Sequence, residues 1–407
     1  MKTGKISLVR MLSLLVLLLG FQSAWADVWD GVTKTPAKKE KIDGKDFFLI
    51  ESAANLAWFS DTVNSLNGSV GLNAKVVANY IDMNHKPFVP IAAGKGDRNY
   101  KGTFDGNHVV IRNLNISSDH ISSINRDYGQ NIAFIAALNG GTVKDVVLDS
   151  VYIKATTDIG SILKGDNNKI SVGTVVAWQK TGTVEGCYAS GIIYNSGKGQ
   201  AVGGIVGNAD AGTIKNNLSI ISIQISGSEA YVGGIIGQAK NDVKIESCVY
   251  DGGKFINDSI ARDGGVIGFR YEGNTTLVKN SYYDENDVDK GVALGSSDGV
   301  FSASVLNENQ IACILNEGEW DGSSCSKEGV WSTGNHITNQ GVSKNDKNET
   351  IFTIKFNANG GKFPEGAKTV KYLRFGELVT SAEITTPIYE GDSIFGDGPW
   401  IQPRQLR

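Results

Sequence analysis

Asp105 and His108 lie three positions apart in the segment FDGNHVV, and such a pair could suggest acid–base catalysis. The surrounding residues favour a structural role instead. Asp-Gly and Asn accept the positive φ angles of tight turns, so Phe104-Asp105-Gly106-Asn107 predicts a turn that joins two strands. We therefore expect a turn aspartate followed by an exposed histidine. The four histidines share no motif: His85, His108, His120 and His336.

Carboxylates are the second candidate for chemistry, because glycoside hydrolysis normally needs two of them a few ångströms apart. Asp145, Glu185 and Glu246 occupy nearly the same position in the repeats of this chain. Glu185 and Glu246 would align two units apart, with Lys215 or Asn216 between them. This spacing predicts a solvated edge. A polysaccharide-degrading enzyme is the alternative that these acids leave open.

Metal and phosphate sites are not predicted. The segment DENDVDKG, residues 284 to 291, has Val288 at the fifth position of a calcium loop, and no glutamate completes the twelve. The glycine-rich stretches VGGIVG and VGGIIG are not followed by GxxxxGK[ST] or by a helix start, as a phosphate-binding loop would be. We expect surface acidity at the first segment and no cofactor.

Five copies of one motif account for these glycines. They begin at residues 132, 172, 202, 232 and 263 and read IAFIAALNGGTVKDVVLD, VGTVVAWQKTGTVEGCYAS, VGGIVGNADAGTIKNNLSI, VGGIIGQAKNDVKIESCVYD and DGGVIGFRYEGNTTLVKNSYYD. The starts step by 40, 30, 30 and 31 residues. A near-constant period of this size is typical of stacked units, each of which buries its apolar side against its neighbours.

The repeat unit is expected to be β. In SIISIQIS, residues 219 to 226, isoleucines alternate with Ser and Gln as in a half-buried strand. The fold class is therefore all-β, a parallel β-helix or β-solenoid of about five coils. We expect the repeat glycines to be structural, because a Cβ at an inward bend would meet the next coil and a positive φ would be available there. They are Gly203, Gly204, Gly207, Gly233, Gly234, Gly237, Gly264, Gly265 and Gly268.

The four cysteines divide into two kinds. Cys187 and Cys248 share one coil position, so two coil spacings of about 4.8 Å each would keep them beyond disulfide reach. We expect them to be small buried side chains. Cys313 and Cys325 are twelve residues apart and could close a disulfide loop.

Two helices are predicted to cover the ends of the stack, because exposed strand edges invite aggregation. In SAANLAWFSDTVNSLNG, Ser52 is the N-cap, Leu56, Phe59 and Val63 share a face, and Gly68 follows the end. The second helix should begin with a capping pair and bury three aliphatic residues at the far end. These residues are Asn307 and Gln310, then Ile311, Ile314 and Leu315.

Residues 1 to 26 have the layout of a cleavable secretory signal. Basic residues precede an apolar run of about eleven residues, which ends at Ala24-Trp25-Ala26. Cleavage there would make the mature chain begin near Asp27. The apolar run is too short for a membrane span, so we expect no membrane span in the mature chain. The whole chain has 39 basic and 43 acidic residues, a balance that gives no electrostatic reason for nucleic-acid binding. Its 50 glycines and 7 prolines are typical of a chain that turns often and keeps its backbone donors for sheets.

The order AANLAWFSDTVN, AKVVANYIDM, FVPIA and YKGTFDGNHVVIRNLNI, followed by VGGIVG-type repeats, resembles the GLUG-motif proteins. These are bacterial exported and surface proteins whose repeats also occur in immunoglobulin A proteases. The resemblance covers residues 45 to 320. One departure is that Asn107 leads directly to His108, where the family commonly has an extra glycine, which implies a shorter turn.

The segment IFTIKFNANGG, residues 351 to 361, with Lys371-Tyr372 and TTPIYEGDSIFGDGPW, resembles one Listeria-Bacteroides repeat of the internalin-B type. The resemblance implies a small β-grasp-like module attached to a cell-envelope protein. The expected domains are a signal peptide at 1–26, a GLUG-type solenoid with its caps at 27–332, a linker at 333–350 and the repeat module at 351–407.

The expected function is that of a non-catalytic exported protein, either secreted or held at the cell envelope or surface. Its side faces would offer ladders of Asn, Ser, Thr and Tyr for an extracellular ligand, a glycan or a surface protein. We expect adhesion or scaffolding, with no cofactor, no metal and no nucleic-acid partner.

Overall fold

The computed structural model is mainly β, with most strands in parallel sheets. It describes residues 28–302, 308–333, 337–339, 343–344, 350–355 and 370–374, apart from 67–69, 94–98, 119–130, 157–170, 197–200, 227–229, 252, 258–261, 272–274, 285–287, 328 and 330. The expected signal peptide and most of the expected C-terminal module lie outside the described residues.

Three parallel sheets run along the molecule, and the smallest, sheet C, takes one strand from each repeat copy. Its strands pair in parallel, with Val172 opposite Val202 and Val202 opposite Val232. Like positions of successive copies therefore lie side by side. The five strands are β8 (Asn131–Ile132), β11 (Ser171–Gly173), β14 (Ala201–Gly203), β18 (Tyr231–Gly233) and β23 (Arg262–Gly264).

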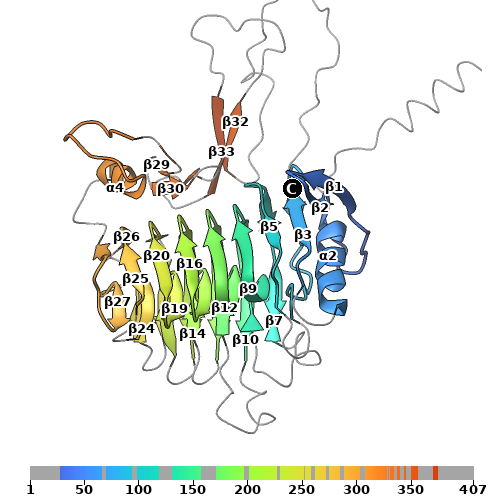
Figure 1. Ribbon diagram of the computed structural model, residues 1–407, viewed down its shortest axis with the longest axis horizontal. Coiled ribbons are helices and arrows are strands. Elements are labelled where there is room, and N and C mark those ends of the chain that lie inside the picture. The colour runs from blue at the N-terminus through green and yellow to red at the C-terminus, as the bar shows by residue number, and fades with distance from the viewer. Residues whose placement is uncertain are drawn as a thin grey trace, which may run out of the picture.

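Sheet B has thirteen strands and extends upstream of the first copy (Figure 1). Its first strand, β1, is antiparallel to β2 and forms one edge of the sheet. The strands are β1 (Lys38–Ile42), β2 (Lys45–Ile50), β3 (Asn73–Val76), β5 (Thr103–Asp105), β9 (Ile135–Lys144), β12 (Val176–Glu185), β15 (Val206–Ala209), β16 (Gly212–Lys215), β19 (Ile236–Ala239), β20 (Val243–Glu246), β24 (Ile267–Arg270), β25 (Leu277–Lys279) and β27 (Val292–Leu294).

Sheet A has ten strands, and it also begins upstream of the first copy. The predicted turn at residues 104 to 107 therefore does not close a hairpin, because it leads from β5 in sheet B to β6 in sheet A. Positive φ angles of 52° at Asn107 and 56° at His108 make this corner. The strands are β4 (Ile81–Asp82), β6 (Val110–Arg112), β7 (Asn115–Ser117), β10 (Val147–Ala155), β13 (Tyr188–Asn195), β17 (Leu218–Ile225), β21 (Val249–Tyr250), β22 (Phe255–Asn257), β26 (Ser281–Tyr283) and β28 (Val300–Ser302).

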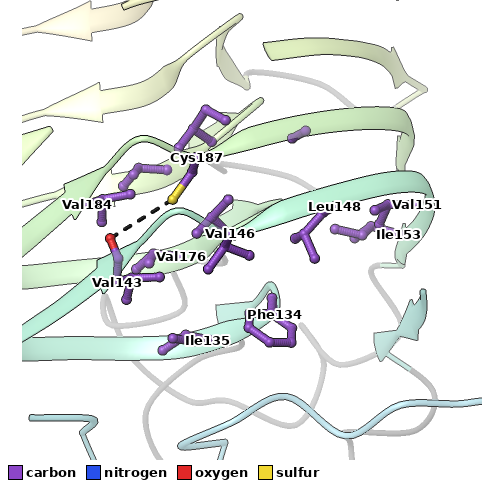
Figure 2. Close-up of a cluster of buried hydrophobic side chains, with 14 of the residues drawn as sticks. Phe134, Ile135, Val143, Val146, Leu148, Val151, Ile153, Val176, Val184 and Cys187 are labelled. Atoms are coloured by element: carbon purple, nitrogen blue, oxygen red, sulfur yellow. Dashed lines mark hydrogen bonds between the residues drawn. The ribbon is translucent and has the colours of Figure 1, made fainter. Parts of the chain in front are cut away.

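Aliphatic side chains of successive copies fill the space between the sheets. Ile205 and Ile235 are both fully buried, and the Ile205 backbone N–H donates to the Ile235 carbonyl at 3.0 Å. Figure 2 shows the same packing around Phe134, Val176 and Val184. One apolar core is therefore continuous along the stack.

The repeat glycines lie where backbones approach closely. A Cβ on Gly204 would collide with the Gly234 carbonyl and the Ser219 hydroxyl, and one on Gly207 would lie 2.7 Å from the Ala177 carbonyl. None of the nine repeat glycines has a positive φ, so that part of the expectation is wrong. Positive φ angles occur instead at corners after several sheet-B strands, for example 54° at Asn216 and 51° at Ser247.

Cys187 and Cys248 are buried, and neither forms a disulfide. Asn217 occupies the equivalent position between them, where its Oδ1 accepts from the Cys187 backbone N–H at 2.9 Å and its Nδ2 donates to the Val184 carbonyl at 3.1 Å. The Cys187 thiol lies 3.9 Å from the Val143 carbonyl (Figure 2). Burial raises the pKa of Cys248 to about 12 and raises the pKa of Cys187 further.

The first predicted helix is α2 (Ala53–Ser65), which packs at the β1–β3 end of the stack (Figure 1). Ser52 is its N-cap and accepts from the Asn55 backbone N–H at 3.1 Å. Leu56, Phe59 and Val63 are buried, and the Phe59 ring centroid lies 6.1 Å from that of Phe104. The helix therefore covers the upstream end of the core. Gly68 is outside the described residues.

The second helix, α4 (Glu308–Leu315), does not cover the far end of the stack as expected. It packs against the side of sheet A, where one outer column of side chains is apolar. The cluster comprises Val147, Tyr188, Leu218, Ile220, Val249 and Tyr282 of the sheet with Ile311, Ala312, Leu315 and Trp331. A disulfide joins Cys313 of α4 to Cys325. Asn307 of the expected capping pair is outside the described residues.

Short antiparallel strands follow the stack in the chain. β29 (Trp331–Thr333) pairs with β30 (Ile337–Asn339), and β31 (Ser343–Lys344) and β33 (Val370–Arg374) flank β32 (Thr350–Lys355). The stretch 333–350, expected to be a linker, thus contains two short strands. None of the helices in the described ranges has the length and apolarity to cross a membrane.

Candidate functional site

One column of sheet B combines aromatic and amide side chains. Trp178 pairs with Asn208, Asn208 with Gln238, and Gln238 with Phe269, on β12, β15, β19 and β24. The next residue on two of these strands, Ala209 or Ala239, belongs to the apolar core. Because side chains alternate along a strand, the Trp178 column faces away from the core. We call this column, with the side chains that contact it, the aromatic–amide face.

Three aromatic rings gather at the downstream end of this face. Phe269 stacks on Tyr231 with ring centroids 4.7 Å apart, and its centroid lies 4.5 Å from that of Tyr271. The Gln238 amide donates to the Tyr271 hydroxyl at 3.1 Å. The Arg262 guanidinium lies 5.6 Å from the Tyr231 ring centroid. All three rings are half-buried, so they are braced by each other and still reach solvent.

At the upstream end, Asp210 organises the polar groups. The Trp178 indole N–H donates to Asp210 Oδ2 at 2.8 Å, and Lys240 Nζ lies 2.9 Å from Asp210 Oδ1. Lys180 lies 4.4 Å from the Trp178 ring centroid. Asn208 Oδ1 is buried without a hydrogen-bond partner among the described residues. The face therefore holds an indole at a fixed orientation beside a buried amide oxygen.

This arrangement suits a sugar more than a charged polymer. Aromatic faces pack against the C–H groups of a ring, while a few fixed polar groups set its orientation. The basic residues Lys180, Lys240 and Arg262 are each engaged with an aromatic ring or a carboxylate. The face therefore presents aromatic rings, and of these three basic residues Lys240 is neutralised by a carboxylate.

A second column at the end of the sheet-B strands carries charges of alternating sign. Parallel pairing places them in the order Lys75, Asp105, Lys144, Glu185, Lys215, Glu246 and Lys279. Lys144 Nζ lies 2.9 Å from Asp105 Oδ2, and Lys215 Nζ lies 3.0 Å from Glu185 Oε2. We call this the charge column.

Two of the three predicted carboxylates lie in the charge column. Glu185 and Glu246 share it, with Lys215 between them, as the sequence predicts. Asp145 is one residue beyond the column, at the corner. Because each acid in the column has a lysine on either side, no two of its carboxylates are neighbours. The column is therefore an ion-pair edge in which lysines separate the acids.

Asp105 and His108 do not form a pair. Asp105 is buried at the end of β5 and accepts from the Asn107 backbone N–H at 2.9 Å, while His108 Nε2 lies 3.6 Å from Asp145 Oδ1. His108 was expected to be exposed, but its side chain is only about one-third exposed (36%). Burial lowers the pKa of Lys144, and the hydrogen bond and charge of Asp105 outweigh that effect, so the pKa is raised. Asp105 therefore neutralises a lysine.

A buried charged group on sheet A was missed by sequence reasoning. Arg112 pairs in register with Asp82 and Asp149, and Ser190 Oγ donates to Asp149 Oδ1 at 2.6 Å. Burial lowers the pKa of Arg112, which the charge of Asp149 partly offsets. The Tyr80 ring lies 5.7 Å from this guanidinium. Arg112 Nε lies 3.9 Å from Asp82 Oδ2, so the charges of these two groups offset each other inside the fold.

Among the described residues, no group of three or more His, Cys, Asp or Glu side chains is placed to hold a metal ion. Residues 285–287 of the acidic segment lie outside that range. Sequence reasoning also missed the aromatic–amide face, although a signal exists. Trp178, Asn208, Gln238 and Phe269 each follow the last residue of the VGGIVG-type motif, and aligning that next position would have exposed the column.

Comparison with protein-family models, with curated proteins and with solved structures returned no match to this chain.

Proposed function

We propose that this chain is an exported, non-catalytic β-solenoid of the GLUG-motif kind, held at or released from the cell surface, and that it binds a glycan on the aromatic–amide face. The motif order in the sequence supports the family, and the register of the three parallel sheets supports the solenoid. The C-terminal segment is proposed to be an internalin-B-type repeat module. Its role would be attachment within the envelope.

The row of Trp178, Asn208, Gln238 and Phe269 is the observation that carries the proposal. A stack of parallel units repeats like positions about every 4.8 Å, so neighbouring rungs can contact one extended ligand at several points. Many weak contacts of this kind give useful affinity when they act together. The charge column, with no neighbouring acids, favours binding over hydrolysis.

The test is a glycan array carrying neutral and acidic oligosaccharides, probed with the protein and with Trp178→Ala and Phe269→Ala variants. Each substitution should weaken binding to the recognised glycan by up to about tenfold, because one stacked ring is lost. Tyr152→Ala is the matched control, since Tyr152 is exposed on sheet A. It should leave binding unchanged.

Two results would contradict the proposal. One is equal binding by the Tyr152→Ala and Trp178→Ala variants. The other is release of reducing sugar from any member of the same glycan panel, which would favour the enzyme. Unfolding curves of each variant exclude a loss of fold as the cause.

A further inference from the structure

A pocket of about 340 Å³ lies between the charge column and the segment that carries the disulfide. Lys215, Asn216, Glu246 and Ser247 line it from the stack. Leu315, Asn316, Glu317, Lys327, Gly329 and Trp331 line it from the other side. The pocket shares no residue with the aromatic–amide face, so a ligand bound in it is independent of the proposed function.

Polar side chains that line the pocket are used to hold its outer wall in place. Ser247 Oγ donates to the Leu315 carbonyl at 3.2 Å, and the Trp331 indole N–H donates to Asn216 Oδ1 at 3.3 Å. Asn316 bonds both backbone groups of Trp331, at 2.8 and 2.9 Å. The wall is therefore fixed on the column, and these groups are not available to a ligand.

Charges are distributed unevenly across the pocket. On the column, Lys215 pairs with Glu185, which lies outside the pocket. Lys279, the other neighbour of Glu246 in the register, lies 3.8 Å from Glu317 instead. The Glu246 carboxylate consequently has no ion pair or hydrogen bond among the described residues. It is the acid of the column that neither lysine neutralises.

The opposite side of the pocket carries one acid and one base, Glu317 and Lys327. Glu317 is shared between Lys279 and Lys327, at 3.8 and 3.4 Å. One carboxylate therefore serves two ammonium groups. Glu246 on the floor has no ion pair among the described residues, and Lys327 on the wall shares its carboxylate partner with Lys279 of the charge column.

We propose that this pocket binds a small zwitterion of the amino-acid class, with its ammonium group at Glu246 and its carboxylate at Lys327. Such a ligand can form an ion pair with Glu246 and with Lys327 at once. A simple cation or anion can pair with only one of them and is repelled by the other. The volume accommodates an amino acid with a side chain of moderate size.

The test uses three forms of one ligand: norleucine, its methyl ester and its N-acetyl derivative, titrated into the full chain by calorimetry. Norleucine should bind, and each blocked form should bind about tenfold more weakly or not at all, because one charge-assisted contact is lost. Glu246→Gln should remove the preference for a free ammonium group. Lys327→Gln should remove the preference for a free carboxylate.

Lys75→Gln is the matched control, since it alters the upstream end of the same column, outside the pocket, and should retain norleucine binding. The proposal is overturned if no form binds, if the three forms bind equally, or if Glu246→Gln binds norleucine as the unaltered chain does. Glycan binding by the Glu246→Gln variant is measured in parallel. Its retention separates a failure of the pocket from a failure of the aromatic–amide face.

Discussion

Single positions in this molecule are constrained by the unit above and the unit below. Cys187, Asn217 and Cys248 occupy one buried column, and the amide in the middle bonds the Cys187 N–H and the Val184 carbonyl. An apolar side chain in place of Asn217 would leave the Cys187 N–H and the Val184 carbonyl without partners, which costs about 1–3 kcal/mol for each group. The buried thiols, in contrast, have to remain neutral.

The buried thiol of Cys248 makes stability depend on alkaline pH. Its pKa is about 12 in the folded protein against an ordinary 9.0, so the unfolded chain releases this proton first. The contribution is fully present below pH 9 and is lost as pH rises from 9 toward 12. Urea unfolding at pH 8, 9 and 10 should show a steeper loss for the native chain than for Cys248→Ala. Parallel curves for the two proteins would refute this assignment.

Close backbone approach at Gly204 gives a second prediction at this scale. Gly204→Ala should lower the free energy of unfolding by at least about 1–3 kcal/mol, because the added Cβ meets the backbone of the next unit. Gly71→Ala is the control, since its Cβ would have no neighbour within 4 Å and its φ is not positive. That change should stay within about 0.5 kcal/mol. Equal unfolding midpoints for the two variants would show that the approach is not as tight as described.

At the scale of elements, the two helices protect different surfaces. α2 covers the upstream end of the core, where β1 adds a lysine-rich antiparallel edge, and charged edge strands resist pairing with other chains. α4 covers an apolar column on the side of sheet A. The disulfide ties this lateral helix to the loop that forms the pocket wall.

Breaking the disulfide should release that lateral cover. The double substitution Cys313→Ser and Cys325→Ser, or reduction of the disulfide, should lower the free energy of unfolding of the α4 segment by about 3 kcal/mol, because the unfolded loop gains chain entropy. The stack should lose less stability than α4. Tyr188, Leu218 and Tyr282 would become exposed, so binding of a hydrophobic dye should rise. Hydrogen exchange should accelerate in residues 308–327 and remain slow in β13 and β17. Uniform acceleration along the chain would mean that α4 and the stack unfold together.

Much of this arrangement could be predicted from the sequence, because register is encoded by repetition. The alternation in SIISIQIS, the start of α2 at Ser52 and the lysine between Glu185 and Glu246 all follow from local rules. The lateral position of α4 does not, since an apolar stripe indicates that a helix is buried and says nothing about which surface it covers. The strands before residue 131 lack the repeat motif, and the aromatic–amide face draws its rings from only some of the copies.

At the scale of the whole molecule, the charge column couples stability to the number of units. Removing residues 202–231, one unit with its lysine at position 215, would bring Glu185 beside Glu246. Glu185→Gln should destabilise the full chain slightly, because it breaks the pair with Lys215. In the shortened chain the same change should stabilise by about 0.2–1 kcal/mol, because it removes a repulsion between like charges. Thermal unfolding of the four proteins tests this reversal of sign, and the same sign in both lengths would contradict it.

The alternation also limits how such a chain can grow. Tandem copying of a single unit inserts one rung and sets two residues of the same sign next to each other, whereas copying two units restores the order. Gene duplication within this protein is therefore expected to be tolerated more readily in even numbers of repeats than in odd ones.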